Sequence, residues 1–512
     1  MTDLCPMPHN LGDLIGHNLP ADLELLIDLS AGDTPARFSA GELRGRVQAF
    51  ARWLRKRGIR PGDRVAFVSD NRWEFLLGYL GTLYMGAVAV PVNHKFSREV
   101  IAHILNDAAA ALVLCDAPRA ELLPSGFTTI GIDGAELFAA SLEAGQELPY
   151  VPGPDDLAEI LYTSGSTGKP KGVPLTHSGQ LWALSHYLAP RPAADEREVS
   201  LIVAPLYHMN ALFFASVCLL NGTRILLQSR FEASAYIDAV ARYQCTLLTG
   251  IPTMFAMVEA LGDDKLPANL TSVKTISIGS APLSLSLLDK IQRRFPAAEV
   301  SNGYGSTEAG PAIFGPHPSG KPKPELSIGY PMEDIEWRLA GGIDNNEGVL
   351  ELKTPAMTGG YLNRPEATSE RFVSGWFSTG DIMRRDEQGF FYFVSRADDM
   401  FVCGGENIYP GEVEAIISRH PAVSEAVVVG APDDIKGSVP VAFVVPKPDM
   451  DVSEDDLKKH SLAQAPAYAH PRRVIFKQAL PLGGTHKIDR RALETEAAEQ
   501  MMASGRASRI SS

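Results

Sequence analysis

The stretch LYTSGSTGKPKGV, residues 161–173, places glycines, two lysines and a run of hydroxyl side chains directly after a strand-like apolar segment. A flexible linker and a loop folded around phosphate both fit this composition. A Walker loop is excluded, because it needs a wider spacing between its glycines, followed by Lys and Ser or Thr. Here only two residues separate Gly165 from Gly168, and Pro170 stands where the hydroxyl belongs. The hydroxyls, backbone N–H groups and lysines suit another kind of anion-binding loop.

The composition is that of a globular protein, with 45% hydrophobic and 21% charged residues. The length of 512 residues predicts more than one domain. The formal net charge of −14 argues against nucleic acid as a partner, because phosphate backbones need a basic face. No apolar run is long enough to span a membrane, and the N-terminus lacks a secretory signal pattern. Five scattered cysteines without a C-x-x-C pair favour a reducing, cytoplasmic location.

Strand-like and helix-like segments alternate from about residue 45 to 300. Residues 64–70 and 87–93 predict buried strands, and residues 71–86 predict the helix between them. Such alternation predicts mainly parallel sheets flanked by helices, with functional loops at the C-terminal ends of strands. After about residue 330, short strands divided by glycine and charged turns predict a small antiparallel β-region.

From about residue 398 the pattern predicts a compact α+β unit, with a helix at 411–420 and strands at 424–432 and 438–446. Ser453 and the acidic residues after it predict the capped start of another helix. The expected fold class is therefore α/β. A large N-terminal domain (1–397) carries the parallel sheets and a β-subdomain, and a small mobile α+β domain (398–512) follows, with a disordered tail from about residue 498.

Seven motifs together resemble the adenylate-forming superfamily of AMP-binding enzymes, in the order in which that family has them. They are TSGSTGKPK (163–171), PLYHMNAL (205–212), ISIGSAPL (276–283), NGYGSTEAG (302–310), WFSTGD (376–381), SRADDMFVCGGENIYPGEVE (395–414) and PLGGTHKIDRRAL (481–493). The chain is identified on these motifs as a member of the superfamily, of the acyl-CoA synthetase type. The resemblance covers about residues 30 to 495.

The resemblance implies an AMP-forming acid–CoA ligase. ATP and a carboxylic acid give an acyl-adenylate and pyrophosphate, and the thiol of coenzyme A then displaces AMP. The implied small molecules are ATP, Mg²⁺, coenzyme A and a fatty acid of short to medium chain or an aromatic acid. The sequence leaves the oligomeric state open, with a homodimer among the options.

Nucleotide contacts follow from the same resemblance. Tyr304 is expected against adenine, Asp381 on the ribose hydroxyls, and Glu308 on Mg²⁺, which prefers oxygen ligands. The full set implied for ATP or AMP is Thr163, Ser164, Gly165, Ser166, Thr167, Gly168, Lys171, Ser280, Ala281, Pro282, Asn302, Gly303, Tyr304, Gly305, Ser306, Thr307, Asp381, Arg396 and Lys487.

The catalytic residues implied are Lys487, Thr307, Glu308 and His208. Lys487 is expected to bridge the substrate carboxylate and the α-phosphate, a task that suits a compact ammonium on a long stem. The family usually has Gly before this lysine, whereas this chain has His486. The resemblance further implies a domain hinge at Asp398 and a thioester site at Gly405 and Glu406, although Val402 replaces a lysine that many relatives carry.

The acid pocket is expected around His208, with Met209 and Met254 nearby; its members are His208, Phe213, Ile251, Gly279 and Gly303. Ordinary core packing is the alternative for each of them. No carboxylate near residue 208 could hold an α-amino group, which argues against an amino acid substrate. The apolar surroundings favour an aliphatic or aromatic acid.

Two other functions are compatible with parts of the pattern. An enzyme that loads a separate carrier protein would use the same first reaction. A non-catalytic nucleotide-binding protein would require the loss of Lys487, Glu308 or Asp381, and the sequence retains all three.

Overall fold

The computed structural model describes residues 7–510 except 17, 31–33, 164–168, 192–196, 263–266, 268–269, 343–345, 404–405, 434–435, 449, 465–469 and 484–486. For residues 406–407 and 502–510 it describes the backbone alone. Among the described residues, no helix has both the length and the apolar character needed to cross a bilayer.

The first sheet of the large domain has seven strands in the order β13-β12-β11-β9-β10-β1-β2. All neighbours pair in parallel except β1 and β2. The bounds are β1 (Glu24–Asp28), β2 (Ala36–Ser39), β9 (Val199–Ile202), β10 (Arg224–Leu227), β11 (Leu247–Gly250), β12 (Thr275–Ile278) and β13 (Glu299–Asn302).

The second sheet has six strands in the order β6-β5-β3-β4-β7-β8. Only β7 and β8 pair antiparallel, and their register joins Thr163 to Lys171, the first and last residues of the predicted phosphate-loop motif. The bounds are β3 (Arg64–Val68), β4 (Val88–Pro91), β5 (Ala110–Cys115), β6 (Thr129–Gly131), β7 (Leu157–Thr163) and β8 (Lys171–Thr176).

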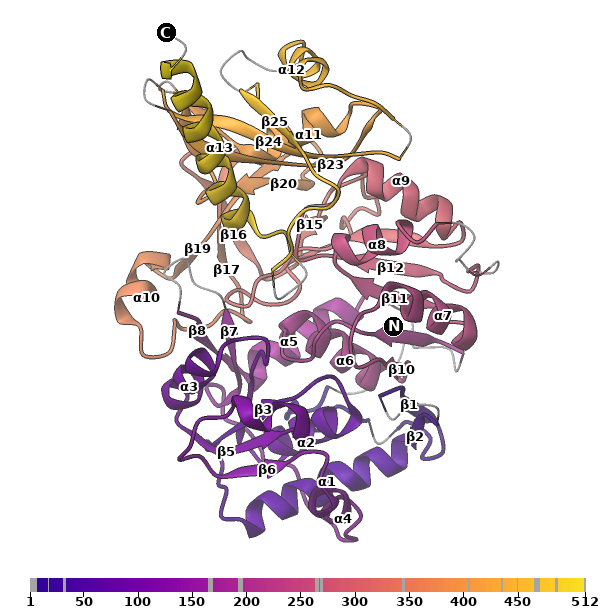
Figure 1. Ribbon diagram of the computed structural model, residues 1–512. Coiled ribbons are helices and arrows are strands. Elements are labelled where there is room, and N and C mark those ends of the chain that lie inside the picture. Colours follow the sequence, from indigo (N-terminus) through magenta and orange to yellow (C-terminus); the bar gives the residue numbers. More distant parts are fainter. Residues whose placement is uncertain are drawn as a thin grey trace.

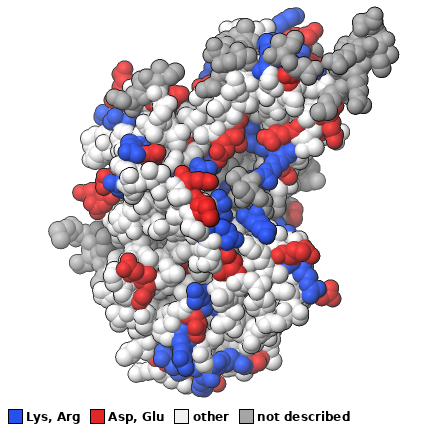
Figure 2. Space-filling model, turned by 90° about the vertical axis from the view of Figure 1, so that its left-hand side faces the viewer, with Lys and Arg blue, Asp and Glu red and all other residues white. Residues whose placement is uncertain are grey.

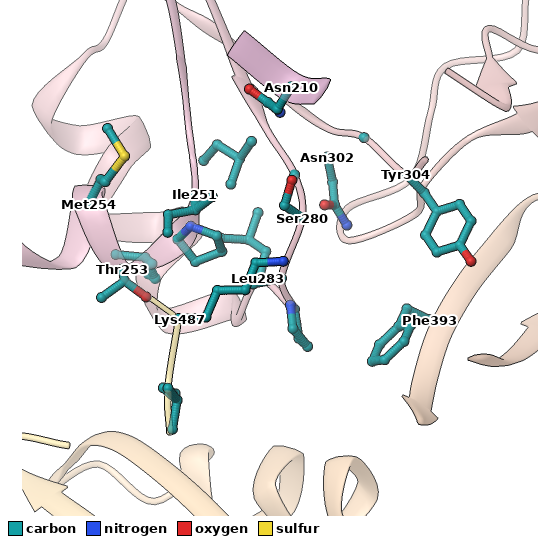
Figure 3. Close-up of a pocket in the computed structure, with 18 of the residues that line it drawn as sticks. Asn210, Ile251, Thr253, Met254, Ser280, Leu283, Asn302, Tyr304, Phe393 and Lys487 are labelled. Atoms are coloured by element: carbon teal, nitrogen blue, oxygen red, sulfur yellow. The ribbon is translucent and has the colours of Figure 1, made fainter. Parts of the chain in front are cut away.

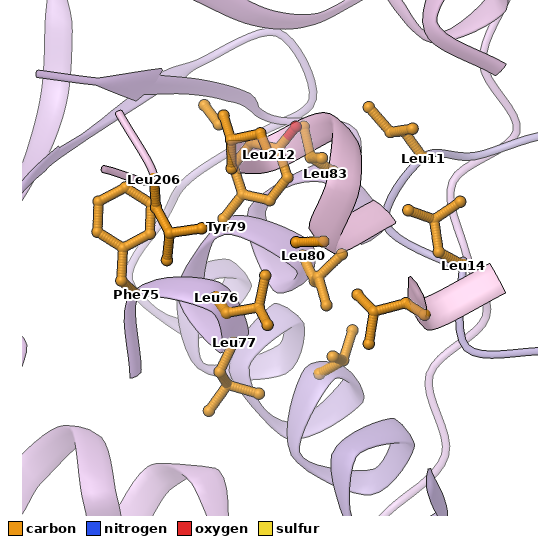
Figure 4. Packing of buried hydrophobic residues seen from close by; sticks show 14 of the residues in the cluster. Leu11, Leu14, Phe75, Leu76, Leu77, Tyr79, Leu80, Leu83, Leu206 and Leu212 are labelled. Atoms are coloured by element: carbon orange, nitrogen blue, oxygen red, sulfur yellow. The ribbon is translucent and has the colours of Figure 1, made fainter. Parts of the chain in front are cut away.

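Helices cover these sheets, as the alternation of segments predicted (Figure 1). Every residue of helix α2 is buried, since a helix that is apolar all round must lie inside the core. Figure 4 shows its leucines and Tyr79 packed with Leu206 and Leu212 from α6 and the segment before it. The helices are α1 (Ala40–Lys56), α2 (Trp73–Tyr84), α3 (Arg98–Asp107), α4 (Ala135–Ser141), α5 (His177–Leu188), α6 (Met209–Asn221), α7 (Ala233–Tyr243), α8 (Pro252–Glu259) and α9 (Leu285–Arg294), with a 3-10 turn at Ala117–Leu122.

The region after residue 330 is the predicted antiparallel β-subdomain. Its main sheet has the order β16-β17-β19-β18, with β20 also paired to β19, and every pairing is antiparallel. Before it, β14 (Phe314–Gly315) and β15 (Tyr330–Pro331) form a separate two-stranded sheet. The elements of the subdomain are β16 (Glu336–Ala340), β17 (Glu347–Lys353), α10 (Pro365–Arg371), β18 (Phe372–Val373), β19 (Trp376–Arg385) and β20 (Phe391–Arg396).

The C-terminal segment folds into the predicted α+β unit, at the top of Figure 1. Its two hydrophobic clusters draw all their members from residues 401–501, which supports our proposed boundary near Asp398. Ser453 caps α12 through a reciprocal capping box with Asp456, as expected. The elements are β21 (Phe401–Cys403), β22 (Glu406–Ile408), α11 (Pro410–Ser418), β23 (Val423–Asp433), β24 (Gly437–Pro446), α12 (Glu454–Leu462), β25 (Arg473–Phe476) and α13 (Arg490–Ile510).

Helix α13 corrects the sequence-based expectation for the C-terminus. The tail predicted to be disordered from about residue 498 is helical to Ile510. Leu493 and Ala497, one turn apart, are fully buried in the small-domain core and anchor the helix there. The alanines in the tail favour a helix, although small and polar residues are also typical of a disordered segment.

Candidate active site

The large and small domains meet across a cleft with a volume of about 2880 Å³. Residues at the C-terminal ends of β11, β12 and β13 line it, together with β19, β20 and the segment around Lys487. Figure 2 shows charged side chains of both signs around a hollow in the middle of one face. Every predicted site residue whose side chain is described lines this one cleft.

The parallel strands of the first sheet bring several predicted positions to one edge. The register joins Ile278 to Asn302, so Gly279 and Gly303 follow their strands side by side. A Cβ atom on Gly279 would lie 3.1 Å from the carbonyl oxygen of Gly303, so a side chain there would crowd the neighbouring chain. Ile251 follows β11 at the same edge. Because two of these positions are glycines, this edge of the sheet exposes backbone as well as side chains to the cleft.

The turn that contains Ser280, Ala281 and Pro282 begins with an uncommon backbone conformation. Ser280 has φ of 65°, in the left-handed region that residues other than glycine rarely adopt. Such strain is found at ligand sites more often than elsewhere. All three residues line the cleft, as the expectation that they flank adenine requires.

A chain of polar contacts joins the predicted adenine, ribose and hinge residues. The Tyr304 hydroxyl donates to Asp381 at 2.5 Å, and the Arg396 guanidinium donates to the other carboxylate oxygen at 2.7 Å. Burial raises the pKa of Asp381, and Arg396 opposes that rise by favouring the charged form. Arg396 also reaches Asp398 at 3.3 Å, and Arg371 pairs with Asp398 at 2.9 Å. The predicted ribose carboxylate and the predicted hinge therefore share one arginine.

Tyr361 is a cleft residue that the motifs did not reveal. Its hydroxyl donates to Glu308 at 3.0 Å, and the Lys171 ammonium lies 5.0 Å from the centre of its ring. It thus connects the last lysine of the phosphate loop to the carboxylate predicted to hold Mg²⁺. Because Tyr361 stands between motifs in the sequence, only the folded chain shows this contact.

Glu308 fits a magnesium ion that is shared with substrate phosphates. Burial raises the pKa of this carboxyl group, and a divalent cation beside it would favour the charged form instead. The described residues contain no cluster of three or more His, Cys, Asp or Glu side chains that could hold a metal. A single carboxylate is sufficient for Mg²⁺, which takes its remaining ligands from water and phosphate.

Replacing Glu308 by Gln should slow acid-dependent ATP–pyrophosphate exchange roughly 100-fold, the usual order for the loss of one electrostatic contact to the reacting group. The isosteric amide keeps the hydrogen bond from Tyr361 but loses the negative charge. Exchange measured across a magnesium titration should show a higher half-saturating concentration. Tyr361→Phe is a comparison variant that removes the hydrogen bond to Glu308 but keeps its charge, so it should raise the half-saturating magnesium concentration less than Glu308→Gln does. An unchanged titration in Glu308→Gln would rule out the metal assignment.

Lys487 reaches from the small domain into the cleft. The Gly483 N–H donates to the Lys487 carbonyl at 2.7 Å, which closes the loop that carries the lysine. Figure 3 shows the side chain pointing in among residues of the large domain, with Ile251 and Met254 on one side and Tyr304 on the other. His486 lies outside the described residues, so its effect on the loop stays open.

Lys487 lines the same cleft as the predicted nucleotide and acid residues. Desolvation lowers the pKa of Lys487, while Asp381 favours its charged form and Arg396 opposes it. His208, directly before α6, is half-buried, and desolvation with help from Lys487 and Lys95 lowers its pKa to about 4. His208 is therefore neutral at physiological pH, and its Nε2 has no hydrogen-bond partner among the described residues. Lys95 lies outside every motif and was not among the predicted residues.

Three aromatic rings line the cleft near His208. Tyr187 packs edge-on against Phe213 and Phe214, with ring centres 5.2 and 5.8 Å apart. Phe213, which directly follows the motif that contains His208, was among the predicted pocket residues, whereas Tyr187 and Phe214 were not. We refer to these three residues as the aromatic triad.

Several expected residues lie outside the described part of the chain. They comprise most of the phosphate loop and one thioester-site residue: Ser164, Gly165, Ser166, Thr167, Gly168 and Gly405. The side chain of Glu406 is likewise not described.

The fold and the site together define a two-domain enzyme that presents a lysine from a small domain to a nucleotide-type cleft in a large one. The chain matches the AMP-binding enzyme family over residues 18–362 and the AMP-binding enzyme C-terminal domain over residues 412–487. It therefore belongs to the AMP-binding enzyme family, as the sequence motifs indicated.

Known relatives are ligases of coenzyme A. The chain is 35% identical over 458 residues to a feruloyl-CoA synthase from Amycolatopsis sp, covering 87% of this chain and 91% of the relative. It is 30% identical over 468 residues to the long-chain-fatty-acid–CoA ligase FadD13 of Mycobacterium tuberculosis, covering 89% of this chain and 92% of the relative. ATP-bound MatB from Rhodopseudomonas palustris superposes with a TM-score of 0.84 at 28% identity, covering 96% of this chain and 99% of that chain. The chain is accordingly an ATP-dependent, AMP-forming acyl-CoA synthetase.

Proposed function

We propose that the protein activates an aromatic carboxylic acid and transfers it to coenzyme A. The observation that supports the residue roles best is that Lys487 points into the cleft between Ile251 at the predicted acid position and Tyr304 at the predicted nucleotide position (Figure 3). A single ammonium in that place can act on both substrates of the first reaction.

In the first reaction a carboxylate oxygen attacks the α-phosphorus of ATP, the bond from that phosphorus to the bridging oxygen breaks, and pyrophosphate leaves. Lys487 stabilises negative charge on the carboxylate and the α-phosphate as they approach. Asp381 and Tyr304 hold the nucleoside, and Thr307 binds the α-phosphate. Mg²⁺ bound at Glu308 would neutralise charge on the phosphates.

In the second reaction the sulfur of coenzyme A attacks the acyl carbon, a carbon–sulfur bond forms, and the carbon–oxygen bond to AMP breaks. We propose that the small domain rotates about Asp398 before this step. That rotation would withdraw Lys487 and bring Gly405 and Glu406 to the acyl-adenylate. A hinge of this kind needs only one residue to absorb the dihedral change.

The aromatic triad supports an aromatic acid over a long alkyl chain. Tyr187, Phe213 and Phe214 already adopt edge-to-face packing, an arrangement that an additional ring can extend. Such pairs contribute about 0.5–1.5 kcal/mol beyond the burial of area. The first-named relative above acts on an aromatic acid by its name, in agreement with this assignment.

A panel of acids tests the proposal. The protein is mixed with ATP, Mg²⁺, coenzyme A and either benzoic or cinnamic acids or straight-chain acids of matched carbon number. We expect kcat/KM for the aromatic acids to exceed that for the matched alkyl acids roughly 10-fold, as one aromatic contact of about 1.4 kcal/mol predicts. Higher efficiency with the alkyl acids would refute the aromatic assignment. Acyl transfer to a carrier protein but not to coenzyme A would refute coenzyme A as the acceptor.

A further inference from the structure

Lys487 lies in the second of two short chain segments that pair antiparallel. The pairing ends where the Asp489 N–H donates to the carbonyl of Pro481 at 2.8 Å. Helix α13 begins at the next residue, Arg490. The Cα atoms of Lys487 and Arg490 are at most about 11 Å apart, because three steps along an extended chain span no more. A shift of Arg490 therefore passes almost directly to the lysine.

Arg490 fastens the start of α13 to two other elements of the small domain. Its guanidinium donates to the Glu414 carboxylate of α11 at 2.6 Å and to the Val428 carbonyl of β23 at 2.9 Å. The same Glu414 oxygen accepts the Val428 N–H at 2.8 Å, so one carboxylate joins all three elements. The side chains of Arg490 and Glu414 are only 27% and 16% exposed, so solvent screens this charge-assisted contact less than it would a surface pair.

Glu414 and Arg490 stand in two different sequence motifs, and no step above assigns either of them a role. Glu414 ends the motif of residues 395–414, and Arg490 lies in the motif of residues 481–493. The two residues are 76 positions apart in the sequence. Their ion pair joins the hinge motif to the lysine motif, and both side chains line the cleft.

Helix α13 has a separate anchor, which argues against a purely structural role for Arg490. Leu493 and Ala497 are fully buried in the small-domain core. They hold the helix on the sheet about one and two turns after Arg490. The contact with Glu414 instead fixes the first residue of the helix, where the segment that carries Lys487 joins it.

A longer contact of Arg490 points toward the proposed hinge. Its Nε lies 3.5 Å from a carboxylate oxygen of Asp399. The neighbouring Asp398 pairs instead with two arginines of the large domain, Arg371 and Arg396. All three partners of Arg490 follow Asp398 in the chain. Rotation about Asp398 should therefore leave these contacts intact and carry the lysine with the small domain as one unit.

We infer that Arg490 is a positioning residue: through Glu414 and Val428 it holds Lys487 at the place in the cleft where the first reaction needs an ammonium. A displacement of about 1 Å can slow a reaction roughly 100-fold, because catalytic groups work only within narrow limits of position. The inference rests on the role proposed above for Lys487, and it adds the ion pair that gives this lysine its place.

Arg490→Gln tests this inference when the two half-reactions are measured separately, with an acid that the panel above identifies. Acid-dependent ATP–pyrophosphate exchange should fall about 10- to 100-fold, because Lys487 is no longer held in place. Thioester formation from supplied acyl-adenylate and coenzyme A should stay within about 3-fold of wild type, since Lys487 acts before that step. Arg473→Gln replaces an exposed arginine of the same domain that does not line the cleft; it is the matched control and should change neither rate.

Two further variants examine the contact itself. Arg490→Lys keeps the charge but replaces the two-armed guanidinium by a single ammonium. It can pair with Glu414 but cannot also hold the Val428 carbonyl in the same geometry, so exchange should recover only in part. Glu414→Gln removes the ion pair from its other side, and it is the second variant if Arg490→Gln does not fold. It should show the same difference between the two reactions.

A double mutant separates positioning from a structural role. In a Lys487→Ala background, Arg490→Gln should slow exchange by less than about 2-fold more, because no ammonium remains to be misplaced. A structural defect would add its full loss to that of Lys487→Ala and would slow both half-reactions alike. Either of these results would overturn the inference, as would unchanged exchange in Arg490→Gln. Exchange that survives Lys487→Ala alone would instead contradict the role of the lysine itself, so the two failures are distinguishable.

Discussion

Lys487→Ala should lose acid-dependent ATP–pyrophosphate exchange by about 100- to 1000-fold, the order found when one group that stabilises transition-state charge is removed. The second reaction should keep its rate when synthetic acyl-adenylate and coenzyme A are supplied, because Lys487 acts before that step. Single-turnover measurement of the two half-reactions separates these effects. The asymmetry follows from the present arrangement of the domains, in which Lys487 points into the cleft among residues of the large domain.

Two variants distinguish a positioned ammonium from a general loss of charge or stability. Lys459→Ala removes an exposed lysine of the same domain and should leave both reactions unchanged. Lys487→Arg keeps the charge but spreads it over a planar group, so exchange should recover only in part. If Lys487→Ala slowed thioester formation as much as exchange, the assigned role would be wrong.

The alternation of segments between residues 45 and 300 was sufficient to predict the parallel sheets. Strands and helices of that kind have distinct hydrophobic periods, and the predicted strand at 64–70 and helix at 71–86 became β3 and α2. The tail from about residue 498 was predicted to be disordered, although it continues helix α13 (Arg490–Ile510), which buries Leu493 and Ala497 in the small-domain core. Composition alone cannot tell a small polar tail from a helix that packs on a sheet.

The site was predictable where a motif contains the functional residue and not where the fold brings separate segments together. Asp381 and Tyr304 stand 77 positions apart, yet both were named from motifs and their side chains meet in the structure. Tyr361 carries no such signal, because its contact with Glu308 depends on tertiary packing. The roles of all these residues stay predictions until they are measured.

Asp398→Pro should have the opposite effect to the loss of Lys487. The ring of proline fixes φ near −65° and also restricts the residue before it, so the chain at this position loses the freedom to rotate. If the thioester-forming orientation falls to about one molecule in a hundred, the second reaction slows roughly 100-fold. Exchange should stay within about 3-fold of wild type, because the present orientation already presents Lys487 to the cleft.

Asp398→Ala is the control that separates the effect of a restricted backbone from the effect of losing the carboxylate. It removes the ion pairs with Arg371 and Arg396, which together hold the pKa of Asp398 below its usual range against the effect of burial. The backbone remains free, so the second reaction should proceed. Arg396 also binds Asp381, however, and its release from Asp398 should strengthen that contact and alter KM for ATP. Slower exchange with normal thioester formation in Asp398→Pro would show that rotation does not occur at this residue, because a locked hinge must impair the step for which the small domain has to move.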